Sequence, residues 1–282
     1  MIVDAHTHAF PPAFLERRNE LLTLDPTFGE LYSNPRARMA TAGDVLSGMD
    51  TAGVDLSIIA GFAWQDASLC REHNEYLLRA AAESRGRLLA FCSLPLADGG
   101  AARDEVTHCV RAGARGFGEL RPESQGVSLA NADVAELLAW AAEAYDVPLL
   151  LHVSEPVGHT YPGKSGQSLG PLCEFLMEWP HVRVIAAHWG GGLPFYALMP
   201  EVKDALANVC VDTAATPFLY DQAIYRLVAG LIGVERILFG SDFPLLAPQA
   251  QLQDLEAVSF TAAERALVAG GNAARLLGLR ES

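Results

Sequence analysis

Two histidines separated by one residue, His6 and His8, end the short apolar run that begins the chain. Side chains alternate between the two faces of a β-strand, so both imidazoles point the same way and can bind one metal ion together. Three further residues of the ligand or base type, His152, His188 and Asp242, each follow another apolar run of strand length. The spacing therefore predicts one metal site assembled from five separated side chains.

The order of the expected elements explains how such residues can meet. Apolar runs of strand length alternate with helical patterns, which predicts a parallel sheet, and eight repeats predict its closure into a barrel. The expected strands cover residues 1–5, 56–61, 88–94, 114–120, 148–151, 182–187, 209–211 and 237–240. The expected helices cover residues 42–51, 68–84, 101–112, 131–145, 168–178, 194–207, 219–231 and 261–277. The fold class is therefore α/β, a (β/α)8 TIM barrel, with a single domain over residues 1–282.

In a barrel of this kind, the carboxyl ends of all strands lie on one face, where active sites form. Taken singly, a histidine at a strand end is more often a hydrogen-bonded structural group, and Asp242 before Phe243 and Pro244 is typical of a turn. Structural histidines have no reason to choose the same end of different strands, so together the residues indicate a functional site. Three imidazoles and a carboxylate favour zinc, with manganese, iron or cobalt as alternatives, over calcium or magnesium.

Two connections are longer than a barrel needs. Residues 9–41 follow the first expected strand, and residues 153–167 follow the fifth. Both leave from carboxyl ends of strands, so we expect long loops over the mouth of the pocket. In the second loop, His159, Tyr161 and Lys164 are candidate substrate contacts, although an ordinary polar surface loop has a similar composition.

The candidate ligands resemble those of the amidohydrolase superfamily, in particular the branch that includes aminocarboxymuconate semialdehyde decarboxylase and related TIM-barrel metal-dependent hydrolases. The resemblance extends over essentially the whole chain. It rests on His6-x-His8, His152, His188, Asp242 and the segment Met-Asp-Thr-Ala-Gly-Val-Asp at residues 49–55. It implies that His6, His8, His152 and Asp242 hold the metal, and that His188 transfers protons or serves as a further ligand.

Glu119, near the end of the fourth expected strand, departs from the decarboxylase pattern. Decarboxylases of this branch usually have no ligand there, whereas some binuclear relatives, such as the TatD-like hydrolases, place a glutamate at that strand end. Two roles are therefore open for Glu119. It binds or bridges a second ion, or it is a pocket carboxylate that orients a water molecule or balances Arg121. The site is expected to hold one or two ions.

The ligand set leads to an expected reaction. A divalent ion lowers the pKa of bound water from about 15.7 toward about 7, so hydroxide is available at neutral pH. A carboxylate or imidazole then moves the proton to the leaving group, and Asp242 and His188 fit this task. We therefore expect a metal-dependent hydrolase that cleaves a C–N or C–O bond of a small carbonyl substrate. Glu119 favours this activity slightly.

Metal-dependent non-oxidative decarboxylation is the alternative activity, since the same fold and ligands serve both chemistries. It needs a proton donor for the substrate carbon and a cation beside the departing carboxylate. The candidate cations are Arg36, Arg38, Arg121 and Lys164. A third interpretation, a non-catalytic barrel that binds metal only for structure, is disfavoured because structural zinc sites are closed, whereas a barrel mouth leaves room for water or substrate.

Two tryptophans follow expected strands, Trp64 after the second and Trp189 after the sixth. We expect them to line an apolar wall that binds an aromatic group, and a place in the core is the alternative. Arg121, at the end of the fourth strand, completes the candidate substrate contacts. The identity of the substrate depends on loop geometry, which one sequence does not determine.

The composition limits the partners. The net charge is −14, with 20 Lys and Arg against 34 Asp and Glu, which argues against a surface for nucleic acid. No apolar run reaches the roughly 18 residues of a membrane helix, and we expect no secretory signal. Five cysteines, an odd number without a Cys-x-x-Cys pair, favour reduced thiols over disulfides. We expect a soluble cytoplasmic enzyme that acts on a small molecule, with a homodimer left open.

Overall fold

The strands of the computed structural model, which describes residues 1–164 and 168–279, form one parallel sheet in chain order. Each strand pairs with the next one along the chain. The strands are β1 (Val3–His8), β2 (Leu56–Ala60), β3 (Leu88–Cys92), β4 (Gly116–Leu120), β5 (Leu149–Leu151), β6 (Val184–Ala186), β7 (Val209–Asp212) and β8 (Ile237–Leu238). Within these described residues, the eight expected strands are confirmed.

Backbone hydrogen bonds join the two edges of this sheet. The N–H of His8 donates to the carbonyl of Phe243 at 2.7 Å, and the N–H of Asp242 donates to the carbonyl of His6 at 2.8 Å. The chain after β8 therefore runs beside β1. This contact closes the sheet into the expected (β/α)8 TIM barrel.

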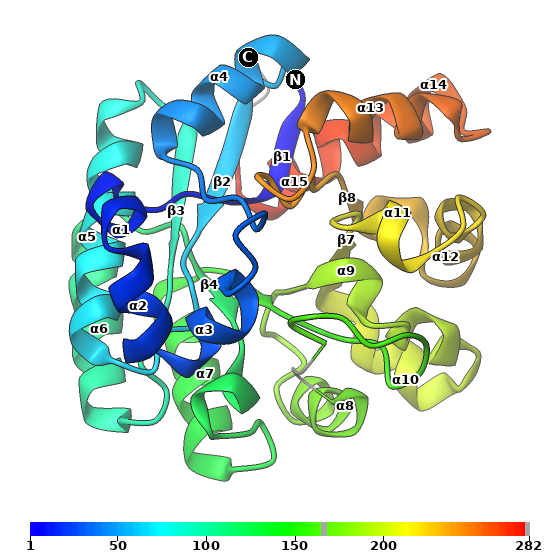
Figure 1. Ribbon diagram of the computed structural model, residues 1–282. Helices are drawn as coiled ribbons and strands as arrows, with labels where there is room; N and C mark the ends of the chain where they lie inside the picture. The colour runs from blue at the N-terminus through cyan, green and yellow to red at the C-terminus, as the bar shows by residue number, and fades with distance from the viewer. Residues whose placement is uncertain (165–167, 280–282) are drawn as a thin grey trace.

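Helices surround the strands (Figure 1). The α-helices are α1 (Pro12–Glu16), α2 (Arg18–Leu24), α3 (Pro26–Tyr32), α4 (Ala42–Ala52), α5 (Ala67–Glu83), α6 (Gly99–Arg111), α7 (Ala132–Tyr145), α8 (Leu169–Glu178), α9 (Ala187–Gly190), α10 (Pro200–Ala205), α11 (Thr216–Leu219), α12 (Ile224–Ile232), α13 (Pro248–Ala257), α14 (Ala262–Ala266) and α15 (Asn272–Leu276). The tighter or wider turns are η1 (Pro122–Gln125), η2 (Leu193–Leu198), η3 (Leu206–Asn208), η4 (Val234–Arg236) and η5 (Leu267–Gly271). None of the helices in residues 1–164 and 168–279 combines the length and the hydropathy of a bilayer-spanning segment.

Three stretches differ from the sequence-based expectation. The connection after β1 contains α1, α2 and α3 instead of an open loop, and α13 lies where no helix was predicted. The single helix predicted over residues 194–207 is divided at Met199, whose backbone is extended with φ −84° and ψ 121°. The next residue is Pro200, and proline disfavours the helical conformation in the residue before it.

Aromatic side chains explain why the connection after β1 is folded. Phe10, Phe14 and Phe28 are fully buried and form one cluster with Phe62 and Trp64, which follow β2. Phe28 stacks on Trp64 with 5.4 Å between ring centroids. Burying a Phe side chain stabilises a fold by roughly 1.5–3 kcal/mol relative to exposing it. The cluster therefore anchors the connection after β1 to the end of β2, next to the carboxyl ends of the strands.

Leu150 tests the packing of the strands. It is fully buried in β5, and Gly118 in β4 leaves room for it, since a Cβ atom at Gly118 would lie 2.5 Å from the Cβ of Leu150. We expect Leu150→Ala to lower the free energy of unfolding by about 2–5 kcal/mol, because burial is lost and a cavity remains. The urea midpoint, followed by circular dichroism, measures this change. Leu198→Ala, at a residue that is 82% exposed, is the control and should change the free energy by less than about 0.5 kcal/mol. Equal urea midpoints for the unchanged protein and Leu150→Ala would contradict the tight packing of Leu150 against Gly118.

Candidate metal centre

The two histidines of β1 meet Asp242 at the carboxyl end of the barrel. The Nε2 atoms of His6 and His8 are 3.1 Å apart, which agrees with their expected place on one face of the strand. The Oδ1 atom of Asp242 lies 3.5 Å from Nε2 of His8 and 3.8 Å from Nε2 of His6. The backbone hydrogen bond from Asp242 to His6 sets this position. Three of the five residues first singled out in the sequence therefore converge.

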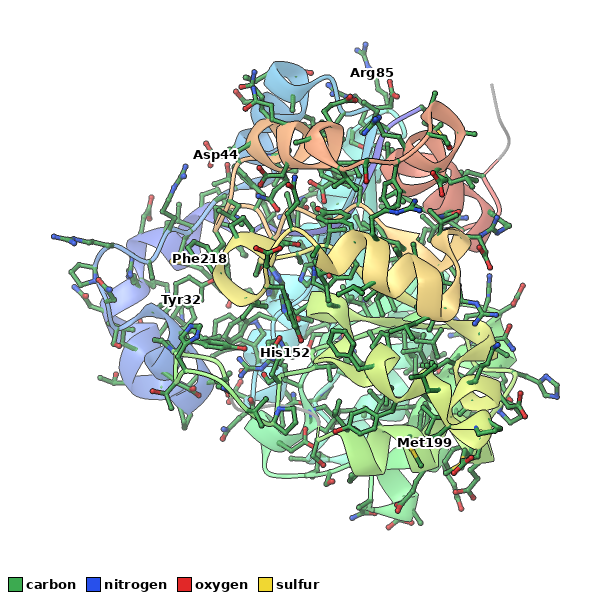
Figure 2. All side chains as sticks on the ribbon, turned by 90° about the vertical axis from the view of Figure 1, so that its right-hand side faces the viewer. Tyr32, Asp44, Arg85, His152, Met199 and Phe218 are labelled. Carbon is green, nitrogen blue, oxygen red and sulfur yellow. The ribbon has the colours of Figure 1, made fainter. Side chains whose placement is uncertain are left out.

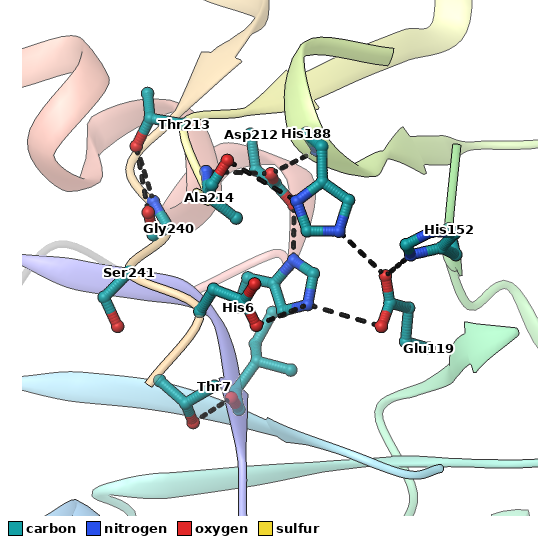
Figure 3. A network of polar contacts seen from close by, with 12 residues as sticks. His6, Thr7, Glu119, His152, His188, Asp212, Thr213, Ala214, Gly240 and Ser241 are labelled. Atoms are coloured by element: carbon teal, nitrogen blue, oxygen red, sulfur yellow. Dashed lines mark hydrogen bonds and ion pairs between the residues drawn. The ribbon is translucent and has the colours of Figure 1, made fainter. Parts of the chain in front are cut away.

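Glu119 of β4 lies between two pairs of imidazoles, and Figure 3 shows it beside His6, His152 and His188. Its Oε2 atom is 3.5 Å from Nε2 of His8 and 3.7 Å from Nε2 of His6. Its Oε1 atom is 2.8 Å from Nδ1 of His152, just after β5, and 3.3 Å from Nε2 of His188, just after β6. The carboxylate is thus shared by two groups of possible ligand atoms, one on each side.

The outer nitrogens of two of these rings face hydrogen-bond acceptors. Nδ1 of His6 lies 2.8 Å from the Oδ2 atom of Asp212, and Nδ1 of His188 lies 3.4 Å from the carbonyl oxygen of Ala214. A carbonyl or an ionised carboxylate only accepts, so we assign the ring proton to Nδ1 in both histidines. In the neutral imidazole, Nε2 then carries the lone pair that binds metal, and in both rings Nε2 faces Glu119.

Asp212, the last residue of β7, is a site residue that the sequence reasoning missed. Its side chain is fully buried, accepts from His6, and also accepts from the backbone N–H groups of His188 at 2.8 Å and Ala214 at 3.1 Å. Burial raises the pKa of Asp212, but the charge and hydrogen bond of His6 outweigh burial, and the net pKa lies below its usual value. Its position at a strand end, shared with the predicted ligands, is the signal that could have found it.

Buried charges in the centre balance one another. Burial raises the pKa of the Glu119 carboxyl, but the surrounding imidazoles outweigh burial and hold the pKa well below its usual range. Burial lowers the pKa of His6, whereas the charges of Asp212 and Glu119 outweigh it and raise the pKa well above its ordinary value. Burial lowers the pKa of His152 to about 4, and Arg121 acts in the same direction. Glu119 is therefore ionised and needs nearby positive charge, which protons or a metal ion supply.

The donor atoms fit a divalent metal ion by type and by spacing. Two ligand atoms that each lie about 2.1 Å from one ion are separated by roughly 3.0–3.4 Å. The nitrogen and carboxylate oxygen atoms around His8 are separated by 3.1–3.5 Å. Mixed imidazole and carboxylate donors suit zinc, manganese or iron. The carboxylate of Asp212, which faces the outer nitrogen of His6, is a partner of the kind that metal-binding histidines commonly have.

A cavity of about 510 Å³ opens beside this centre, between the connection after β1 and the loop after β5. Its apolar and aromatic lining includes Tyr32, Phe62, Phe218, Leu219 and Leu245, and its cationic lining includes Arg36, Arg38 and Arg121. Figure 2 shows Tyr32 and Phe218 near one another, on the side of the molecule where His152 lies. Apolar walls with a few convergent polar groups are typical of a site for a small molecule.

The loop after β5 contributes some of its predicted substrate contacts and not others. His159 and Tyr161 line the cavity, together with Arg121 at the end of β4. Lys164 does not line it; its Nζ atom donates to the carbonyls of Val157 and His159 at 2.6 and 2.7 Å, so the ammonium group holds the loop itself. Residues 165–167 of the predicted loop lie outside the described residues.

Both tryptophans expected in the pocket wall lie in the core, which corrects that prediction. Trp64 is fully buried in the aromatic cluster after β1, and its indole N–H donates to Nδ1 of His73 at 2.9 Å. Trp189 is fully buried, packs edge-on against Tyr225, and donates to the hydroxyl of Thr216 at 2.8 Å. Each ring buries its apolar body and satisfies its N–H, as core tryptophans do. Phe62 and Phe218, instead of the two tryptophans, form the aromatic part of the cavity wall.

Comparisons with known proteins agree on one family. A family model described as amidohydrolase matches residues 3–279. Gamma-resorcylate decarboxylase of Rhizobium sp. (strain MTP-10005) is 26% identical over 253 residues, which cover 75% of this chain and 76% of that enzyme. A crystal structure of 2,6-dihydroxybenzoate decarboxylase with 2,6-dihydroxybenzoate covers 99% of both chains at 21% identity and a TM-score of 0.77. Dihydroxybenzoic acid decarboxylase of Polaromonas sp. JS666, with bound manganese, covers 100% of this chain and 98% of that one at 19% identity and a TM-score of 0.76.

Asp212→Asn tests whether the buried carboxylate orients His6. The amide N–H2 of asparagine would face Nδ1 of His6 and move the ring proton to Nε2, the nitrogen that faces the centre. We expect the affinity for Zn²⁺ to fall by roughly 10–100-fold, measured by competition with a chromophoric chelator. Asp104→Asn, on the exposed side of α6, makes the same chemical change at the surface and should leave the affinity unchanged. Equal affinity in both variants would show that Asp212 does not orient a ligand.

Proposed function

The chain belongs to the amidohydrolase family, and from that premise we propose that it is a metal-dependent non-oxidative decarboxylase of a small hydroxylated aromatic acid. The observation that carries this proposal is the similarity to gamma-resorcylate decarboxylase over three quarters of both chains. The hydrolysis of a C–N or C–O bond, which the sequence favoured, finds no support among these relatives. The alternative activity named from the sequence therefore replaces it.

The proposed metal ligands are His6, His8, His152 and Asp242, with Glu119 beside them. The distances among the donor atoms of His6, His8 and Asp242 and the orientation of the His6 ring support the first site, and His152 reaches it through its contact with Glu119 at 2.8 Å. The Polaromonas structure contains manganese, so Mn²⁺ replaces Zn²⁺ as our first choice. A bound divalent ion supplies positive charge that polarises the oxygen atoms of an acidic substrate.

The proposed reaction replaces a carboxylate group by hydrogen. The bond between the ring carbon and the carboxyl carbon breaks, carbon dioxide leaves, and the electron pair that stays on the ring carbon takes a proton. We assign the proton to His188, whose Nε2 faces Glu119 and whose ring lines the cavity. Burial lowers the pKa of His188, but the hydrogen bond and charge of Glu119 outweigh burial and raise it above its ordinary value. Asp242 is the second candidate for moving this proton.

The cavity lining supports an aromatic acid as substrate. Phe62, Tyr32 and Phe218 offer flat apolar surface for a ring, and aromatic contacts of this kind contribute about 0.5–1.5 kcal/mol beyond burial. Arg121 is buried among the lining residues, and Arg36 lies at the cavity on the connection after β1. A guanidinium group matches the geometry of a carboxylate. We therefore propose that these arginines attract and orient an anionic substrate.

Decarboxylation is tested with the purified protein, stripped with a chelator and reconstituted with Mn²⁺. We expect carbon dioxide release from 2,6-dihydroxybenzoate or a related hydroxybenzoate, loss of activity on renewed chelation, and a fall in kcat of roughly 10²–10⁴-fold in His188→Asn. His181→Asn, at an exposed histidine just before β6, is the matched control and should keep full activity. Hydrolysis of an amide, ester or lactone in the same panel, without carbon dioxide release, would contradict the proposal.

The number of ions tests the role of Glu119. We propose that its carboxylate would bridge two ions, because its Oε2 atom faces His6 and His8 while its Oε1 atom faces His152, which leaves His188 for proton transfer. We expect about two Mn²⁺ per chain in the reconstituted protein and about one in Glu119→Gln, measured by mass spectrometry of the metal content. Glu136→Gln, on the exposed face of α7, is the control and should bind as the unchanged protein does. One ion per chain in every variant would assign Glu119 to the other role, a pocket carboxylate.

A further inference from the structure

The backbone of Gly163, in the loop after β5, is held at both its N–H and its carbonyl oxygen. The N–H of Gly163 donates to Oε1 of Glu30 at 2.9 Å, and its carbonyl oxygen accepts from Nη2 of Arg121 at 3.0 Å. The same oxygen lies 3.1 Å from Nε2 of His152. Glu30 belongs to α3, Arg121 follows β4 and His152 follows β5. The two long connections over the cavity are therefore joined at this residue.

Gly163 is suited to this place by its backbone. Its φ is +88°, in the region that favours glycine, and a Cβ atom there would lie 2.7 Å from Cδ2 of Leu31. Leu31 is the neighbour of Glu30 in α3, so the close approach and the hydrogen bond involve the same turn of helix. Gly163 is thus located by packing as well as by hydrogen bonds.

Two acceptors compete for the ring proton of His152. In one tautomer Nε2 donates to the carbonyl oxygen of Gly163, 3.1 Å away, and in the other Nδ1 donates to the Glu119 carboxylate, 2.8 Å away. The hydroxyl of Ser154 lies 3.1 Å from Nε2, but a hydroxyl either donates or accepts and cannot fix the proton by itself. With the proton on Nε2, the neutral ring presents the lone pair of Nδ1 toward Oε1 of Glu119, 2.8 Å away. A lone pair and a carboxylate oxygen repel each other at this distance unless a cation lies beside both.

We propose that the backbone of Gly163, held by Glu30 at its N–H and by Arg121 at its carbonyl, stabilises the tautomer of His152 that binds metal, and thereby couples metal binding to the position of the loop after β5. This inference rests on the metal-dependent function proposed above and adds three positioning groups to it. Coupling of this kind is reciprocal: if the held loop favours metal binding, the metal favours the held loop by the same factor. Glu30 is the residue with which to test it, because it is exposed and is not among the residues that line the cavity.

The first measurement compares Glu30→Ala with Glu30→Gln. Alanine removes the acceptor for the Gly163 N–H, whereas glutamine keeps an acceptor oxygen at the same place. We expect the affinity of the metal-free protein for Mn²⁺, measured by competition with a chelator, to fall roughly tenfold in Glu30→Ala and to be largely restored in Glu30→Gln. Gly163→Ala, which strains the same backbone, should lower the affinity in the same direction.

The second measurement reads the tautomer directly. In protein labelled with ¹⁵N-histidine, the diamagnetic ion Zn²⁺ should move the ring proton of His152 to Nε2, because it removes the repulsion between the Nδ1 lone pair and Glu119. In the metal-free protein, Glu30→Ala should lower the population that has the proton on Nε2. The variant His152→Asn assigns the signals. A merely structural role of Glu30 would lower stability without moving this ring proton.

The third measurement tests reciprocity and separates the two proposals. Mn²⁺ should slow hydrogen exchange of the backbone amides in residues 155–164 of the unchanged protein, and should slow it less in Glu30→Ala. Absence of Mn²⁺ binding in the unchanged protein would overturn the metal-dependent function and this inference together. Equal Mn²⁺ affinity and an equal ring tautomer in the unchanged protein and Glu30→Ala would overturn the coupling alone and leave the decarboxylase proposal standing.

Discussion

The backbone contact between β1 and the chain after β8 is the constraint on which the candidate centre depends. The hydrogen bond from the N–H of Asp242 to the carbonyl of His6 closes the barrel and sets the Asp242 carboxylate beside the two imidazoles of β1. The two ends of the sheet are separated by more than 220 residues of sequence. Barrel closure therefore builds the site and the fold in the same step, since neither edge of the sheet contains a complete set of ligands.

Buried carboxylates orient the imidazole rings of the candidate centre. Two carboxylates, Glu119 and Asp212, are buried at the carboxyl ends of β4 and β7, and isolated charges there would be costly. Each is paired with imidazole nitrogens, so that Asp212 faces the outer nitrogen of His6 while Glu119 faces its inner nitrogen. This arrangement orients the rings before any ligand arrives. It also explains why replacing one of these carboxylates or imidazoles is expected to disturb the orientation of the remaining side chains.

The chemistry is divided between the strand ends and the long connections. Imidazoles and carboxylates at the strand ends suit either hydrolysis or decarboxylation, because a polarising cation and a proton carrier serve both. The connections after β1 and β5 add the aromatic walls, the arginines and the Gly163 backbone. Substrate specificity therefore depends on the connections after β1 and β5. The first is anchored by its aromatic cluster, and the second by its hydrogen bonds to the first. The reaction proposed for this chain follows from that lining and from its relatives, not from the ligand set.

The sequence by itself determined the barrel, the order of its strands and the ends at which His6, His152 and Asp242 lie, because strand and helix periodicity and the order of elements are written locally along the chain. Only the tertiary structure decided that Glu119 lies between two pairs of imidazoles and that Asp212 orients His6. The tertiary structure also placed the two tryptophans in the core and turned Lys164 onto its own loop. These outcomes depend on distances between residues that are far apart in the chain, and local pattern carries no record of such distances.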